Sequence, residues 1–145
     1  MSLVERLVLD TSTVVSAMLR PASLPRQVFL HAFARYEVCV SASTLAEFEK
    51  VLTRPKFNRY LDQKERLAFY NLYRKHARLW PITESEELAF GKVCRDKNDQ
   101  KFLILAASCG AKTLISSDAD LLVMQPWGEI SILSPSDFLG ALQLR

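Results

Sequence analysis

The fold is decided by residues 6–15, which read RLVLDTSTVV. Residues 6–9 form a short apolar run that is typical of a buried parallel strand, and this run ends at Asp10. The sequence then has helical character from Thr11 to Leu19, until Pro21 stops it. A strand that passes through an acidic residue into a helix is typical of an open α/β sheet, in which ligands bind beyond the carboxyl ends of the strands.

The same alternation of strand and helix continues to the end of the chain. Further strands are predicted at residues 37–40, 79–82, 113–116 and 130–133. Helices are predicted at residues 25–34, 41–53, 62–78, 84–93, 118–124 and 135–142, with another from Asp96–Asp99 to Ser108. This order predicts an α/β fold, a three-layer α/β/α sandwich with a central parallel sheet of about five strands. We expect residues 1–145 to form one domain.

The composition excludes several classes of protein. Of 145 residues, 49% are hydrophobic and 24% are charged, as in ordinary globular proteins. The sequence has neither a run of about 18 apolar residues nor the apolar core of a signal peptide, so we expect a cytoplasmic protein that does not bind a membrane. The three cysteines are unpaired in the sequence and lie in apolar stretches, which predicts buried free thiols. With only two histidines, any metal is expected to have oxygen ligands, which suit Mg²⁺ or Mn²⁺.

Familiar catalytic motifs are missing. The four glycines form neither a dinucleotide-binding fingerprint nor a phosphate-binding loop, and no serine-hydrolase elbow is present. Residues 10–13 begin like the D-x-D-x-T motif of haloacid-dehalogenase phosphatases. The second aspartate of that motif is replaced by Ser12, so the general acid of a phosphatase is absent.

Four acidic residues lie where an open α/β sheet places its active site. Asp10 follows the first strand, Glu47 lies one turn into the helix after the second, Asp99 opens the helix that leads to the fourth, and Asp118 follows the fourth. Two carboxylates about 4 Å apart repel by roughly 4 kcal/mol at an effective dielectric near 20. Since a divalent cation reverses that cost, convergent acids indicate a metal site, and such a site can activate water for attack on phosphorus.

Each acid also has a purely structural interpretation. Asp10 and Asp118 are good helix N-caps, and Thr44 and Glu47 have the spacing of a capping box. Asp96 and Asp99 suit the positive end of a helix macrodipole. These roles are compatible with a metal site.

A basic stretch covers residues 54–78. It holds eight cations against Asp62 and Glu65, for a formal charge of +6, and the cations are Arg54, Lys56, Arg59, Lys64, Arg66, Arg74, Lys75 and Arg78. Aromatic residues interleave with them, namely Phe57, Tyr60, Phe69, Tyr70 and Tyr73. Cations that contact phosphate and aromatics that stack on bases would bind RNA, and Arg54, Lys56 and Arg59 are the candidates. The alternative is a solvated helix face whose aromatics belong to the core or to a dimer contact.

Five segments resemble the PIN-domain family. Residues 8–17 (VLDTSTVVSA), 43–52 (STLAEFEKVL), 94–103 (CRDKNDQKFL) and 114–122 (LISSDADLL) resemble its four acidic motifs, and residues 132–139 (ILSPSDFL) resemble its closing strand and helix. The resemblance is greatest to VapC-like PIN proteins, the toxin components of toxin–antitoxin systems. Two departures are Gln100, where many relatives have an acid or Asn, and Ser117, where glycine is usual.

The resemblance implies an endoribonuclease that depends on Mg²⁺ or Mn²⁺ and leaves 5′-phosphate and 3′-hydroxyl ends. It assigns catalysis and metal binding to Asp10, Glu47, Asp99 and Asp118. Supporting roles fall to Thr11, Ser12, Asp96, Ser116, Ser117 and Asp120. The expected partners are RNA, a cognate antitoxin and a second copy of the chain. Two alternatives stay open, a non-catalytic RNA-binding module with the same fold and an RNA-processing nuclease outside any toxin–antitoxin system.

Overall fold

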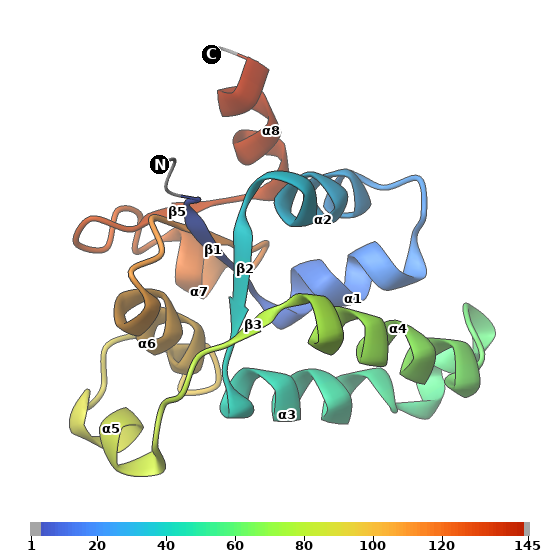
Figure 1. Cartoon of the computed structure of the whole chain (residues 1–145), viewed down its shortest axis with the longest axis horizontal. Helices are drawn as coiled ribbons and strands as arrows, with labels where there is room; N and C mark the ends of the chain where they lie inside the picture. The colour runs from blue at the N-terminus through green and yellow to red at the C-terminus, as the bar shows by residue number, and fades with distance from the viewer. Residues whose placement is uncertain (1–3, 144–145) are drawn as a thin grey trace.

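The computed structural model describes residues 4–143 and contains a five-stranded parallel sheet in the order β3-β2-β1-β4-β5 (Figure 1). The strands are β1 (Arg6–Leu9), β2 (Glu37–Val40), β3 (Arg78–Leu79), β4 (Thr113–Ile115) and β5 (Ser131–Leu133). All four strand pairings are parallel, and β1 lies at the centre between β2 and β4. The carboxyl ends of β1 and β4 therefore lie side by side, with Leu9 paired to Ile115.

Helices cover both faces of the sheet. They are α1 (Thr11–Leu19), α2 (Leu24–Arg35), α3 (Ala42–Leu52), α4 (Gln63–His76), α5 (Glu84–Ala89), α6 (Gln100–Cys109), α7 (Ala119–Leu122) and α8 (Pro135–Gln143), with a 3₁₀ helix η1 (Pro55–Arg59). α6 packs on β1, β2 and β4 from one side, and α1 to α4 lie on the other (Figure 1). The predicted three-layer sandwich is confirmed.

Two hydrophobic cores explain why β1 is apolar from Leu7 to Leu9. Leu7 and Leu9 point into the core beneath α1, α2 and α3, whereas Val8 points into the core beneath α6. In β4, Ile115 likewise belongs to the core beneath α1, α2 and α3, and Leu114 belongs to the core beneath α6. A parallel strand that is buried on both faces needs apolar side chains at every position, so it reads as a continuous hydrophobic run.

The prediction was least accurate between residues 78 and 100. β3 pairs only over Arg78–Leu79 at the sheet edge instead of 79–82, and α5 ends at Ala89 instead of Val93. Gly91 follows with φ of +68°, a backbone conformation that ends helices. α6 begins at Gln100, so Asp96 lies in the turns that precede it rather than in the helix. The 3₁₀ helix η1, which starts at Pro55, was not predicted.

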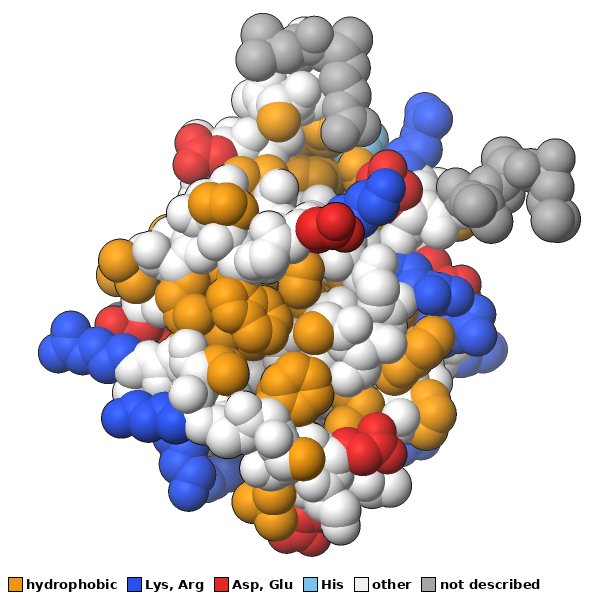
Figure 2. Space-filling model, turned by 90° about the vertical axis from the view of Figure 1, so that its left-hand side faces the viewer, with side chains coloured by type: hydrophobic (Ala, Val, Ile, Leu, Met, Phe, Trp, Pro, Cys, Tyr) orange, Lys and Arg blue, Asp and Glu red, His pale blue; other side chains and the backbone are white. Residues whose placement is uncertain are grey.

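The surface on the side of α5 and α6 carries hydrophobic side chains near its centre and charged ones mostly at its edge (Figure 2). Cys39, Cys94 and Cys109 are buried free thiols, as predicted. Among residues 4–143, no helix has the length and hydropathy that a membrane crossing requires.

Candidate metal centre

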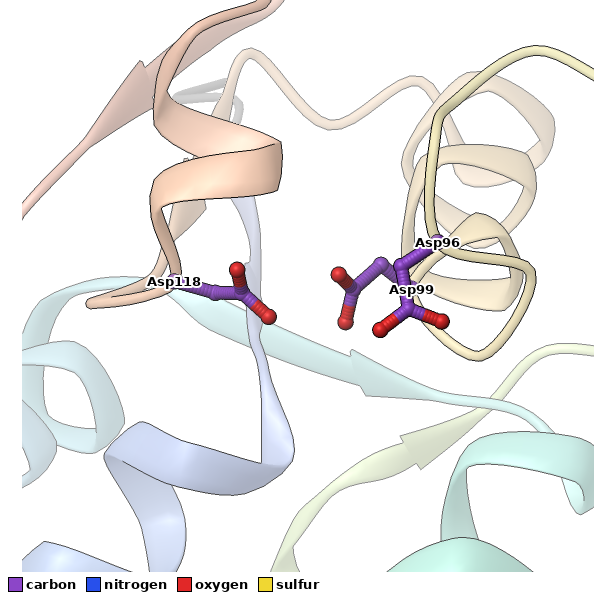
Figure 3. A group of neighbouring side chains, drawn as sticks. All are labelled: Asp96, Asp99 and Asp118. Atoms are coloured by element: carbon purple, nitrogen blue, oxygen red, sulfur yellow. The ribbon is translucent and has the colours of Figure 1, made fainter.

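Three aspartates converge beyond the carboxyl end of β4. Asp118 begins α7 directly after this strand, while Asp96 and Asp99 come from the turns before α6 (Figure 3). One carboxylate oxygen from each lies within 4.8 Å of the others. The chain thus brings together acids that are about 20 residues apart, because the turns before α6 meet the end of β4.

Asp99 is the least satisfied side chain of the three. It is 9% exposed, and its Oδ2 atom is buried without a hydrogen-bond partner among the described residues. Burial first, and then the neighbouring carboxyls of Asp118, Asp96 and Asp10, together raise the pKa of Asp99 to about 7. Asp99 occupies the N-cap position of α6, near the positive end of the helix macrodipole, but its side chain makes no capping hydrogen bond. An unpaired buried oxygen costs free energy that a bound cation would recover.

Asp118 is both a helix cap and a member of the group of three aspartates. Its Oδ1 accepts a hydrogen bond of 2.9 Å from the backbone N–H of Asp120, which caps α7. Its own backbone N–H donates to Ser116 Oγ at 2.9 Å. Asp120 therefore contributes a backbone donor to the site, whereas Ser117 is exposed beside it.

Asp10 follows β1 and is connected to Asp118 through Ser116, and hydroxyl groups hold its carboxylate. Ser116 Oγ donates to its Oδ2 at 2.5 Å, Thr13 donates to Oδ1 through Oγ1 at 2.8 Å, and Ser12 Oγ lies 2.9 Å from Oδ1. The Thr13 backbone N–H also donates to Oδ1. Asp10 therefore caps α1, as its structural interpretation predicted. Burial raises the pKa of Asp10 despite these hydrogen bonds. Asp10 is outside the group of three, and its charge acts on Asp99.

Glu47 is neutralised by a cation. Lys101 Nζ lies 3.0 Å from its Oε1, and Thr11 Oγ1 donates to its Oε2 at 2.6 Å. The capping box predicted for Thr44 and Glu47 is wrong, because the box forms between Ser41 and Thr44. Sequence reasoning missed Lys101, since its partner is 54 residues away and nothing local marks it.

Gln100 has a structural role. Its Oε1 accepts a hydrogen bond of 2.9 Å from Val93 N–H, and its Nε2 donates to the carbonyl of Gly91. The side chain thus braces the loop between α5 and α6, while its neighbour Asp99 lies beside Asp118. Gln100 stands where many relatives have an acid or Asn, yet the group still has three carboxylates because Asp99 supplies one of them.

A family model described as a PIN domain matches residues 6–120, more than half of the chain. The chain belongs to the PIN-domain family. The matched segment of this PIN protein includes all four acids that the resemblance had assigned to the site. No curated protein sequence matches the chain.

Solved structures share the fold of this PIN protein. VapBC2 from Rickettsia felis, bound to a promoter DNA fragment, has a TM-score of 0.61 at 12% identity and covers 89% of this chain and 98% of its own. VapC20 from Mycobacterium tuberculosis, a toxin that cleaves the sarcin-ricin loop, has a TM-score of 0.55 at 15% identity, covering 79% and 91%. DNA-bound VapBC from Salmonella typhimurium has a TM-score of 0.57 at 18% identity, covering 90% and 98%. At these identities the likeness shows the fold.

Proposed function

We propose that this PIN protein is an endoribonuclease that hydrolyses RNA phosphodiester bonds and requires Mg²⁺ or Mn²⁺. The observation that carries the proposal is the buried, unpartnered Oδ2 of Asp99 within a group of three convergent aspartates. A carboxylate so placed is costly without a cation and favourable with one. Hydrolysis with a metal-activated water needs no nucleophilic side chain and no phosphate-binding loop, which fits the motifs that the sequence lacks.

The donor set fits a hard divalent cation. Asp99, Asp118 and Asp96 offer only oxygen atoms, which Mg²⁺ and Mn²⁺ prefer, and the group contains no thiol or imidazole. Asp99 and Asp118 would hold the ion, with Asp96 beside them and Asp10 connected to Asp118 through Ser116. When bound, such an ion polarises the phosphoryl group and lowers the pKa of water. The three-acid group supports Asp96 as a ligand candidate, where the resemblance implied a lesser role.

The surrounding residues position these acids. Ser116 is fully buried, and its hydroxyl donates to Asp10 and accepts from the N–H of Asp118, so it ties the ends of β1 and β4 together. Ser12 and Thr13 orient the Asp10 carboxylate from α1. Lys101 forms an ion pair with Glu47 and holds it near the start of α6. We assign Glu47 to the edge of the site, where it would orient water or substrate.

We further propose that the nuclease is the toxin of a toxin–antitoxin pair. The structures it resembles include VapBC assemblies and the toxin VapC20, which supports this assignment. A cognate antitoxin would block the acidic end of the sheet, and a homodimer in the cytoplasm is the expected form. The RNA contacts would include Arg54, Lys56 and Arg59, which are exposed around η1.

The purified protein is expected to cut single-stranded RNA with Mn²⁺ or Mg²⁺ and to stop when EDTA is added. After EDTA has removed the metal, the three aspartates repel one another. Metal that is added back should therefore bind to them and restore cutting. Denaturing gel electrophoresis of an end-labelled RNA measures the rate and, by comparison with markers, the end chemistry. RNA cutting that continues in EDTA, or none in any divalent metal, would contradict the proposal.

Growth arrest on expression, relieved by the product of a neighbouring gene, tests the toxin role separately.

A further inference from the structure

A pocket of about 330 Å³ lies between α1 and η1. Three of its lining residues are cations, Arg20, Lys56 and Arg59, and none of its described lining residues is acidic. Within residues 4–143, no carboxylate lies within ion-pair distance of these three cations. Like charges gathered around one concave surface without counter-charges attract an anion.

The wall of this pocket is held in place by a buried arginine. Arg66 is fully buried in α4, so it does not contribute to the basic surface in which the sequence interpretation had counted it. Its Nη1 donates to the carbonyl of Leu61 at 2.6 Å, and its Nη2 donates to Asn58 Oδ1 at 3.0 Å. These bonds link α4 to the segment that carries Lys56 and Arg59.

Aromatic rings accompany the cations. The Lys56 ammonium lies 5.2 Å from the centre of the Phe57 ring, and the Arg59 guanidinium lies 5.3 Å from that of Tyr60. Tyr60 lines the pocket and is 55% exposed. By contrast, Tyr70 and Tyr73 of the same basic stretch are buried in the core. An exposed ring beside cations is the combination that binds single-stranded nucleic acid, in which bases stack and phosphates contact cations.

α1 connects the pocket to the aspartates. Ser12 and Ser16 are four residues apart on one face of α1, and Arg20 follows as the C-cap of this helix. Ser12 binds Asp10 at one end, while Ser16 and Arg20 line the pocket at the other. From Ser12 to Arg20 the helix rises by about 12 Å. A strand only a few nucleotides long would reach from the acids to the pocket.

We propose that the pocket of Arg20, Lys56 and Arg59 binds a backbone phosphate of single-stranded RNA a few nucleotides away from the bond that is cut, with Tyr60 stacking on the adjacent base. This proposal rests on the ribonuclease function and names the part of its substrate that lies outside the acidic centre. It adds Arg20 to the RNA-binding residues proposed above, whereas Arg54 lies outside this pocket.

The test compares the double variant Arg20→Gln/Arg59→Gln with Arg35→Gln, which removes an exposed cation at the end of α2. Fluorescence anisotropy with a labelled single-stranded RNA of about 12 nucleotides, in EDTA so that no cutting occurs, measures binding. The double variant should bind roughly tenfold more weakly, and the slope of log K against log salt should fall by about 0.7, which corresponds to the one lost phosphate contact. Arg35→Gln should match wild type in both.

Cutting assays in Mn²⁺ separate this pocket from the active site. The double variant should cut the long RNA less efficiently, yet cut a trinucleotide at the wild-type rate because so short a strand does not span both sites. Equal binding and equal cutting of the long RNA would overturn the pocket proposal and leave the ribonuclease intact. If wild type cuts nothing while the double variant still loses RNA binding, the nuclease proposal fails and the RNA-binding pocket stands. If the pocket bound an aspartate-rich peptide and not RNA, the pocket proposal would be overturned. Unchanged thermal melting verifies that the variants fold.

Discussion

Asp118→Asn and Asp99→Asn are each expected to lower the rate of RNA hydrolysis by about 10²–10³-fold, since a lost metal ligand removes several kcal/mol of transition-state stabilisation. Both side chains belong to the group of three acids, and neither forms an ion pair among the described residues. Asparagine keeps the shape and an oxygen of each aspartate, so the loss would report on charge. The measurement is the initial rate of cleavage of a labelled RNA at saturating Mn²⁺.

The matched control is Asp137→Asn, the same chemical change at an exposed position of α8. It should cut RNA within a factor of two of wild type. Asp118→Asn also keeps the oxygen that caps α7, so its circular dichroism spectrum should be unchanged. Wild-type rates in the Asp99 and Asp118 variants would remove the acidic group from the mechanism.

The second large effect concerns stability without metal. Asp99→Asn is expected to raise the melting temperature of the EDTA-treated protein at pH 8 by about 3–6 °C, equivalent to about 1–2 kcal/mol after solvent screening of the carboxylate. The reason is that Asp99 has a pKa of about 7 in the folded chain, above its ordinary value of 3.8. Between about pH 4 and pH 7 the folded protein therefore holds a proton that the unfolded chain releases, and the stability lost over this range is still missing at pH 8.

The sign of the pH dependence follows from that shift. Below pH 4 the carboxyl is protonated in both states, so wild type and Asp99→Asn should differ little. As the pH rises from about 4 to about 7, the wild type should lose stability relative to the variant, and the difference should level off above pH 7. Scanning calorimetry in EDTA at several pH values measures this difference. A variant that is less stable than wild type at pH 8 would show that Asp99 stabilises the metal-free fold.

Local pattern was sufficient to predict the sheet. Leu7, Val8 and Leu9 are apolar because both faces of β1 are buried there, and the same holds for Leu114 and Ile115. The positions of Asp10 and Asp118 followed from the strands that precede them, because parallel strands end at one edge. The segment from Gly91 to Asp99 was not predictable in this way, since Gln100 determines its path through bonds to the Gly91 carbonyl and the Val93 N–H.

The partners of the acids were also hidden from the sequence. Glu47 carries an ordinary capping-box pattern with Thr44, and only the folded chain brings Lys101 to it. Ser116 and Asp10 are 106 residues apart, yet their hydrogen bond links the ends of β1 and β4. Buried Arg66 looked like one more surface cation, because burial of a charged side chain depends on tertiary contacts such as Leu61 and Asn58. Sequence pattern located the acids, and long-range packing determines which of them converge.

Calorimetric titration of Mn²⁺ into the metal-free protein at pH 8 tests most directly whether the convergent aspartates form a divalent-metal site. Wild type and Asp137→Asn should bind the ion with the same affinity, and Asp99→Asn should bind it at least tenfold more weakly or not at all. Equal Mn²⁺ affinity in wild type and Asp99→Asn, or no binding to wild type, would contradict the account.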